Sequence, residues 1–169
     1  MTQQQTFVFA NAPTHQIPAL QASVRDALAT LDGQNVTTIG DVVMLRLARA
    51  TDAIALCLNT ISTLDPTGSG RLRFGVDTGI AVRDGERWGG PVVELAARLA
   101  DHANHGQILA SQATRQATDR AQIDFVDLGE HHLHGDGPPT AIYSAYRIAD
   151  LDCPDPASAS PVFKTPPRR

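Results

Sequence analysis

The sequence predicts one α+β domain in which helices flank a mixed sheet. Two periodicities alternate along the chain. Apolar residues recur at every second position in some runs and at every third or fourth position in others, and these are the spacings of strands and helices. Some strand-like runs form close pairs, while others are separated by helical runs. Hairpins join antiparallel strands and helical crossovers join parallel ones, so the two together predict a mixed, mostly antiparallel sheet.

The first half of the chain predicts two helices on either side of a hairpin. The short apolar run 6–10 is rich in aromatic and β-branched residues, which favours a buried strand. Apolar residues at helical spacing predict helices over 19–31 and 51–64. Between them, residues 35–47 hold strand formers on both sides of Gly40-Asp41, a pair that suits a tight turn. With the strand that follows, this order matches the ferredoxin-like pattern.

The second half adds further strands and two more helices. Alternation of apolar with polar or small residues predicts a strand that begins near Leu72 and ends in a turn at 83–86. Pro91 is suited to the first turn of a helix, and Ser111 is suited to the cap of another. The remaining predicted elements are a helix over 91–104, a strand at 107–110, a helix from 111 to about 120, and strands at 123–128 and 140–147.

Composition sets broad limits on the class of protein. The 169 residues are enough for one compact domain, expected over 1–149, and the Pro- and Ser-rich segment 150–169 is expected to be a flexible tail. The net charge of −4 argues against a nucleic-acid partner. No apolar run approaches the roughly 20 residues that span a bilayer. Cys57 and Cys153 lie in different settings, so a reducing cytoplasm is expected, although a disulfide stays open.

Five segments together carry a family resemblance. They are TFVFAN, VTTIGDVVML, LRFGVDTGIAV, WGGPVVELAARLADHANHGQILAS and FVDLGEHHLHGDGPPTAIYSAY. In this order and at about this spacing, they resemble the catalytic domain of class III nucleotidyl cyclases, which are adenylate and guanylate cyclases. The resemblance covers roughly residues 5 to 147. It implies a ferredoxin-like cyclase homology domain.

The resemblance implies a reaction and a set of positions that perform it. A cyclase closes the ribose 3′-hydroxyl onto the α-phosphate and expels pyrophosphate, with two divalent ions that activate the attacking oxygen and shield the phosphates. In the family, two aspartates hold the ions, and a lysine and an aspartate read the purine. An asparagine and an arginine four residues apart stabilise the reacting phosphate, and a further lysine holds the outer phosphates. Both chains of a head-to-tail dimer contribute residues.

Two of these seven positions match the family. Asp41 stands at the second metal aspartate and Arg98 at the phosphate-stabilising arginine. The five substituted positions are Asn11 at the first metal aspartate, Thr37 and Arg87 at the purine-reading lysine and aspartate, Glu94 at the asparagine, and His134 at the phosphate lysine. An amide brings no charge to a metal ion, so Mg²⁺ binding should weaken greatly.

Two further departures concern the phosphates. The segment from Asn11 to Asp41 is shorter than the family implies, and its first turn contains Pro13 and Pro18, which lack the amide hydrogens that a phosphate cradle needs. Glu94 stands four residues before Arg98, the favourable orientation for a helix-surface ion pair, although a pairing across a dimer interface stays open. That pair would neutralise the retained arginine, and Glu94 would also repel a triphosphate.

Some of these residues have ordinary structural explanations. Gly40-Asp41 suits a hairpin turn without any metal, and this interpretation is favoured. Arg87 and Trp88 could stack on a base or anchor a partner, or Trp88 could cover the edge of the core; both interpretations stay open. The histidines at 131, 132 and 134 suggest a metal cluster, but an exposed polar strand end is favoured because no carboxylate or thiolate cluster accompanies them.

These substitutions favour a cyclase homology domain that is catalytically silent or very weak. It would act in regulation, as a homodimer, as a heterodimer with another cyclase-like domain, or by binding a ligand or partner. One alternative is an active adenylate or guanylate cyclase that makes cyclic nucleotide from ATP or GTP with substitute residues. Another is a binding module for a different nucleotide or metabolite. No cofactor is expected unless a nucleotide is bound, in which case Mg²⁺ or Mn²⁺ would accompany it.

Overall fold

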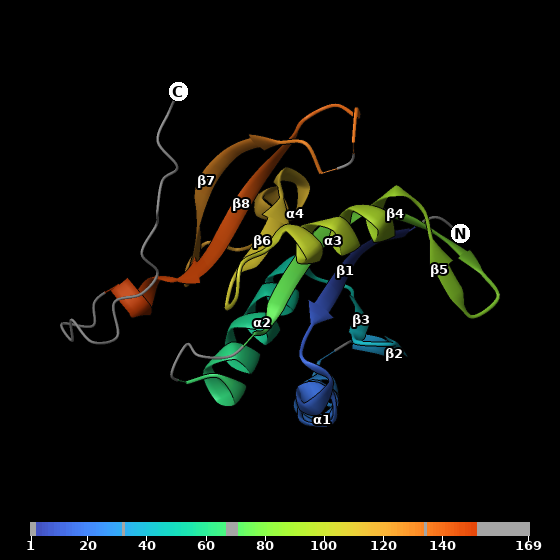
Figure 1. Cartoon of the computed structure of the whole chain (residues 1–169), viewed down its shortest axis with the longest axis vertical. Coiled ribbons are helices and arrows are strands. Elements are labelled where there is room, and N and C mark those ends of the chain that lie inside the picture. Colours follow the sequence, from blue (N-terminus) through green and yellow to red (C-terminus); the bar gives the residue numbers. More distant parts are fainter. Residues whose placement is uncertain (1–2, 32, 67–70, 134, 152–169) are drawn as a thin grey trace.

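The computed structural model describes residues 3–31, 33–66, 71–133 and 135–151. An eight-stranded mixed sheet runs through this part of the chain in the order β2-β3-β1-β4-β6-β8-β7, with β5 paired to β4. Among the described strands, only β4 and β6 pair in parallel. The strands are β1 (Gln3–Asn11), β2 (Gly33–Ile39), β3 (Val42–Leu47), β4 (Arg73–Asp84), β5 (Arg87–Gly89), β6 (Ile108–Ser111), β7 (Ile123–His131) and β8 (Thr140–Arg147). Figure 1 shows β7 and β8 at one side of the molecule and the β2–β3 hairpin at the other.

Four α-helices and two short 3₁₀ helices accompany the sheet in the described residues. They are η1 (Thr14–Gln16), α1 (Ile17–Leu28), α2 (Ala50–Leu64), α3 (Pro91–His102), α4 (Gln112–Ala117) and η2 (Ile148–Leu151). The order of strands and α-helices is the one that the periodicities predict, so the α+β class and the mostly antiparallel sheet are confirmed. No helix in these ranges is long and apolar enough to span a membrane.

The fourth helix is shorter than predicted. Ser111 caps it as expected, because its side chain accepts a hydrogen bond from the Thr114 backbone nitrogen. The helix ends at Ala117, not near residue 120, because Thr118 adopts an extended conformation with φ −88° and ψ 132°. The Thr118 hydroxyl bonds back to the Thr114 carbonyl oxygen at 2.7 Å, and such local bonds compete with helix continuation.

Strand β1 separates two apolar cores. Val8 and Ala10 point into the larger core with α1 and α2, whereas Phe7 and Phe9 point into a second core with α3. Successive side chains of a strand point to opposite faces, so the apolar run of β1 is buried on both sides. Helices α1 and α2 therefore cover one face of the sheet and α3 covers part of the other.

Helix α3 lies very close to β4 at one glycine. A Cβ atom added to Gly75 would lie 2.2 Å from both the Ala96 carbonyl oxygen and the Ala100 backbone nitrogen. Only a residue without a side chain permits this approach. Small residues of α3 thus place that helix, together with Glu94 and Arg98, directly over the middle of the sheet.

Neither the possible disulfide between Cys57 and Cys153 nor the expected C-terminal tail can be followed in the described residues. Cys57 is a buried free thiol in α2, and burial raises its pKa, but Cys153 lies beyond the described ranges. The tail expected over 150–169 lies almost entirely beyond them too.

Candidate functional site

Asn11 and Asp41, the residues at the two predicted metal positions, are neighbours in the structure. Asn11 is the last residue of β1 and pairs with Val42 of β3. Asp41 immediately precedes Val42, in the turn where Gly40 has a φ of 60°. The Ala12 backbone nitrogen donates to the Asp41 carbonyl oxygen at 3.5 Å. The fold therefore brings together positions that are 30 residues apart.

Asn11 does not present its amide nitrogen to Asp41. The side chain is only 8% exposed, and its Nδ2 donates to Oδ1 of Asp101 at 2.9 Å. Asp101 follows Arg98 by three residues on α3, and the Arg73 guanidinium donates to its backbone oxygen at 3.4 Å. Sequence reasoning missed Asp101. Its helical spacing from Arg98, one turn away, is the signal that could have indicated a place beside this site.

The exposed Asp41 carboxylate has a local partner. Its Oδ1 accepts a hydrogen bond from the Thr14 hydroxyl at 2.9 Å, which ties the hairpin turn to the start of η1. The Gly40 conformation and this bond together account for an aspartate at this place in a turn. This hydrogen bond gives Asp41 a structural role in the turn, in addition to its position in the family pattern.

The turn after β1 has few free backbone amides. Pro13 and Pro18 have none, the amides of Gln16 and Ile17 bond to Pro13 and Thr14 carbonyl oxygens, and the Ala12 amide bonds to Asp41. Of the seven residues from 12 to 18, only two, at 14 and 15, keep an amide outside these bonds. Both prolines fit the geometry of a 3₁₀ turn that leads into a helix, but they reduce the donors available to a phosphate.

The expected Glu94–Arg98 ion pair is present on α3. The Arg98 Nη2 and the Glu94 Oε2 are 3.8 Å apart, and the side chains are 36% and 68% exposed, respectively. At this exposure, the pair contributes only a few tenths of a kcal/mol to stability. Its larger effect concerns any phosphate near Arg98, because Glu94 supplies a negative charge within reach of the same guanidinium.

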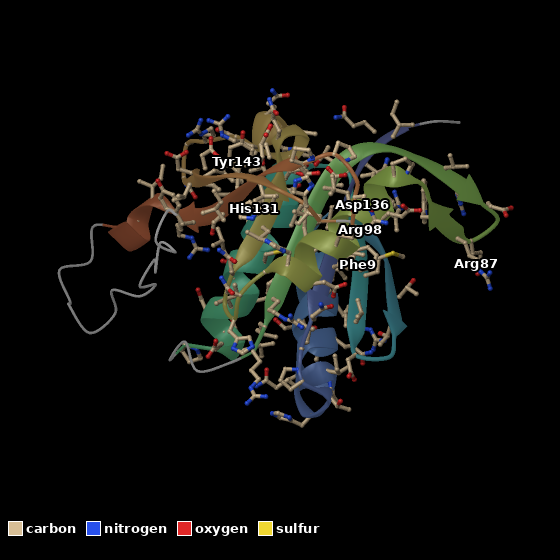
Figure 2. All side chains as sticks on the ribbon, turned by 45° about the horizontal axis from the view of Figure 1, so that its top comes forward. Phe9, Arg87, Arg98, His131, Asp136 and Tyr143 are labelled. Atoms are coloured by element: carbon tan, nitrogen blue, oxygen red, sulfur yellow. The ribbon has the colours of Figure 1, made fainter. Side chains whose placement is uncertain are left out.

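The other residues at family positions lie on different elements. Thr37 is exposed on β2, opposite Met44 of β3. Arg87 begins β5, and Figure 2 shows it on the β4–β5 hairpin, directed away from Arg98. His134 lies outside the described residues. The structure therefore groups Asn11 with Asp41 and Glu94 with Arg98, but it does not bring Arg87 to Arg98.

Trp88 covers the edge of the core, which was one of the two interpretations that the sequence left open. Its ring packs against Phe7, with 6.0 Å between ring centres, and joins the core beneath α3. The arginines on its ring are Arg46 and Arg83. Its sequence neighbour Arg87 is not one of the cation–π partners among the described residues.

One of the predicted histidines, His131, lies beside a histidine of α3. His131 ends β7, and its ring centre is 5.2 Å from that of His102 on α3. Burial and the nearby His131 both lower the pKa of His102. His132 follows the end of the strand and bonds to the Gly137 carbonyl oxygen at 2.9 Å. No group of three or more metal-ligating side chains occurs in the described ranges.

Solved structures of nucleotidyl cyclases share the fold of this chain. An adenylate cyclase of Trypanosoma brucei in its monomeric state matches with a TM-score of 0.73 and 20% identity, over 84% of this chain and 87% of that one. The adenylyl cyclase CyaB from P. aeruginosa matches with a TM-score of 0.71 and 19% identity, over 86% and 95% of the two chains. This chain has the fold of a class III nucleotidyl cyclase catalytic domain. The resemblance seen in the five sequence segments is thereby confirmed at the level of the fold.

Sequence relatives of this cyclase-fold chain come from mycobacteria. A Mycobacterium tuberculosis protein described as uncharacterized is 42% identical over 101 residues, which are 57% of this chain and 34% of that protein. A pH-sensitive adenylate cyclase of the same species is 32% identical over 83 residues, or 48% of this chain and 21% of that one. The matched region thus spans about a third or less of these relatives. No family model matches the chain.

The donor set at the cyclase metal position does not suit two divalent ions. The carboxylates near it are Asp41, which accepts from Thr14, and Asp101, whose Oδ1 accepts from Asn11. The third side chain, Asn11, is a neutral amide that donates through its nitrogen to Asp101. Mg²⁺ is held in proteins mainly by carboxylates and phosphates, and replacing one aspartate by asparagine removes one of the two charges that the cyclase pattern supplies.

Proposed function

We propose that this chain is a cyclase homology domain with little or no cyclase activity, which acts in regulation by pairing with another cyclase-like domain or by binding a ligand. The observation that carries the proposal is the Asn11–Asp101 hydrogen bond. A hydrogen-bond donor occupies the side-chain position where the cyclase reaction needs a metal-binding carboxylate. Loss of a single group that stabilises a transition state commonly lowers the rate by about 10²- to 10³-fold.

Two features on the phosphate side support the same proposal. The turn between β1 and α1 keeps only two backbone amides outside internal bonds and prolines, so it offers a poor cradle for a triphosphate. Glu94 places a carboxylate beside Arg98, and this carboxylate would repel a phosphate that approached the guanidinium. Each feature weakens binding of the same charged group, so their effects should reinforce one another.

A protein partner is supported by the β4–β5 hairpin. Ile80 and Val82 are 62% and 61% exposed on β4, and they point to the same side because they are two residues apart in a strand. Figure 1 shows the hairpin extending away from the rest of the sheet. A second copy of this chain or another cyclase-like domain would remove these two side chains from water, which favours association.

The proposed lack of activity is tested by an assay of the purified chain. ATP and GTP would each be supplied with Mg²⁺ or Mn²⁺, and cyclic nucleotide would be measured. We expect no product above the level of a heat-denatured sample. Robust formation of cyclic nucleotide from either substrate would overturn the proposal. The mass of the chain in solution, measured across concentrations alone and with a cyclase-like domain, tests pairing separately.

A multiple substitution tests why activity is low. Family residues would be restored together with Asn11→Asp, Thr37→Lys, Arg87→Asp, Glu94→Asn and His134→Lys. We expect this variant to stay far below a competent cyclase, because the turn from 12 to 18 still keeps only two backbone amides outside internal bonds and prolines. High activity would instead show that the turn is adequate and that the side chains alone limit the reaction.

A weakly active cyclase is the second candidate. It is favoured by the placement of Asp41 beside Asn11 and by the partial match to a pH-sensitive adenylate cyclase. Asn11 and Asp41 would then hold one Mn²⁺, and His134 would contact phosphate. This candidate requires Arg98 to stabilise the reacting phosphate, so Arg98→Ala should abolish any activity that is measured. Activity that survives this substitution would rule the candidate out.

A further inference from the structure

Two arginines lie against one tryptophan ring on the sheet face that carries α3. The guanidinium carbon of Arg46 is 4.8 Å from the centre of the Trp88 ring, and that of Arg83 is 5.8 Å from it. These residues come from β3, β4 and β5, and Trp88 pairs with Arg83 across the β4–β5 hairpin. We refer to Arg46, Arg83 and Trp88 as the arginine–tryptophan cluster.

Hydrogen bonds fix both guanidinium groups. The Arg46 Nη1 donates to Oε1 of Gln5 at 2.7 Å, and Gln5 is itself 2% exposed on β1. The Arg83 Nε donates to the Gly85 carbonyl oxygen at 2.8 Å. A guanidinium has five N–H donors, so these bonds orient each arginine and leave further donors available.

No ion pair among the described residues involves Arg46 or Arg83. The ion pairs there are Glu94–Arg98 and Arg120–Asp124, and neither involves the cluster. Burial lowers the pKa of Arg46, and the charge of Arg83 lowers it further, so the two guanidinium groups repel each other. The Arg46 Nε and the Trp88 Nε1 are also buried without an acceptor in these ranges. The exposed Arg83 guanidinium therefore keeps donors that a ligand can reach, and neither arginine of the cluster has a charged acceptor in the described residues.

The geometry indicates which ligand would supply that acceptor. Guanidinium groups already lie on the Trp88 ring, which disfavours stacking of a nucleotide base there. A carboxylate has two acceptor oxygens and a phosphate group has three, so a phosphate can accept from both guanidinium groups through different oxygens. We propose that the arginine–tryptophan cluster binds the phosphate groups of a phosphorylated small molecule.

This site is separate from the cyclase metal position. Arg46 stands four residues beyond Val42, the β3 residue that pairs with Asn11, and this separation is about 13 Å along a strand. The cluster also shares no residue with Asn11, Asp41, Glu94 or Arg98. The proposal therefore does not depend on whether the chain is an active cyclase.

Inorganic tripolyphosphate in the absence of divalent ions is a suitable probe. Thermal stabilisation and titration calorimetry would be measured for the unmodified chain, Arg83→Gln and Arg46→Gln. Arg25→Gln is the control, since it removes the same charge from an exposed position on α1. We expect each cluster substitution to weaken binding by at least about tenfold and Arg25→Gln to change it less than about twofold. The exposed Arg83 keeps the test valid if Arg46→Gln does not fold.

Two comparisons identify the chemistry. ATP without metal should bind in the same Arg83-dependent manner as tripolyphosphate, whereas adenosine should not bind at the cluster. Failure of tripolyphosphate to bind the unmodified chain would overturn the proposal, as would binding that neither cluster substitution weakens. Self-association that Arg83→Gln abolishes, without tripolyphosphate binding, would assign the cluster to a partner's carboxylate and would also overturn it. A cyclase assay has no bearing on these outcomes, because the probe is metal-free and cannot be cyclised.

Discussion

The side-chain amide of Asn11 donates a hydrogen bond to the Asp101 carboxylate, with 2.9 Å between the nitrogen and the oxygen. This contact joins the end of β1 to the last turn of α3. It explains why an amide is accommodated at a position where the cyclase pattern has a carboxylate, because an aspartate there would face Asp101 with a like charge. The substitution at position 11 and the residue at position 101 therefore form one local arrangement.

Asn11→Asp should destabilise the chain. It replaces the donor with a second carboxylate beside Asp101, so a hydrogen bond to a charged group is lost and a repulsion is gained. We expect a decrease of about 1–3 kcal/mol in the free energy of unfolding at neutral pH without divalent ions. Chemical denaturation measures this difference directly.

The exchanged pair Asn11→Asp with Asp101→Asn is the matched control. It restores one donor and one acceptor with their places reversed, so most of the lost stability should return. A double variant no more stable than Asn11→Asp alone would show that the hydrogen bond is not what position 11 requires. The coupling between the two substitutions isolates the contact from the effect of each change by itself.

Glu94→Gln should hardly change stability. The ion pair with Arg98 is 3.8 Å long and half exposed, so its loss should cost less than about 0.5 kcal/mol. The effect should shrink further at high salt, because exposed charges are screened. A loss above about 1 kcal/mol in denaturant unfolding would show that Glu94 has another role in holding α3.

The sequence predicts the fold more completely than it predicts the contacts of the candidate site. Strand and helix periods are local, so β1, the β2–β3 hairpin and the Glu94–Arg98 pair follow from neighbouring residues. Asp101 was missed because its partner is 90 positions away. The partners of Trp88 were missed for a related reason, since Arg46 comes from a strand that only the sheet order brings near it. The end of α4 depended on a threonine side-chain bond that no periodicity encodes.

Gly75→Ala should be strongly destabilising, whereas Gly79→Ala on the same strand should be tolerated. The added methyl group at 75 would lie 2.2 Å from two backbone atoms of α3, so the helix would have to move. Overpacking of this kind typically costs about 1–3 kcal/mol or more. At 79, the nearest atom is a Val92 side-chain carbon at 3.4 Å, an ordinary contact. Equal effects of the two substitutions on the unfolding midpoint would contradict the close approach of α3 to β4.

Asp77 should make stability depend on pH. Burial raises the pKa of its carboxyl to about 6, although hydrogen bonds from Ser111 and the Thr78 backbone oppose the rise. Its ordinary pKa is near 4 in the unfolded chain. The folded state therefore holds this proton more tightly than the unfolded state does, and stability should fall as the pH rises from about 4 to about 6. The pKa difference corresponds to a loss on the order of 2–3 kcal/mol.

Asp77→Asn isolates this contribution. Both hydrogen bonds to residue 77 are accepted by Oδ1, from the Ser111 hydroxyl at 2.5 Å and the Thr78 nitrogen at 2.8 Å. An asparagine carbonyl can accept both bonds, so the variant should keep its packing and lose most of the slope of melting temperature between pH 4 and 6. Asp26→Asn, an equal charge change on the exposed face of α1, should leave that slope in place. If Asp77→Asn retained the full slope, another group would have to hold the proton, because the carboxyl would no longer be there to bind it.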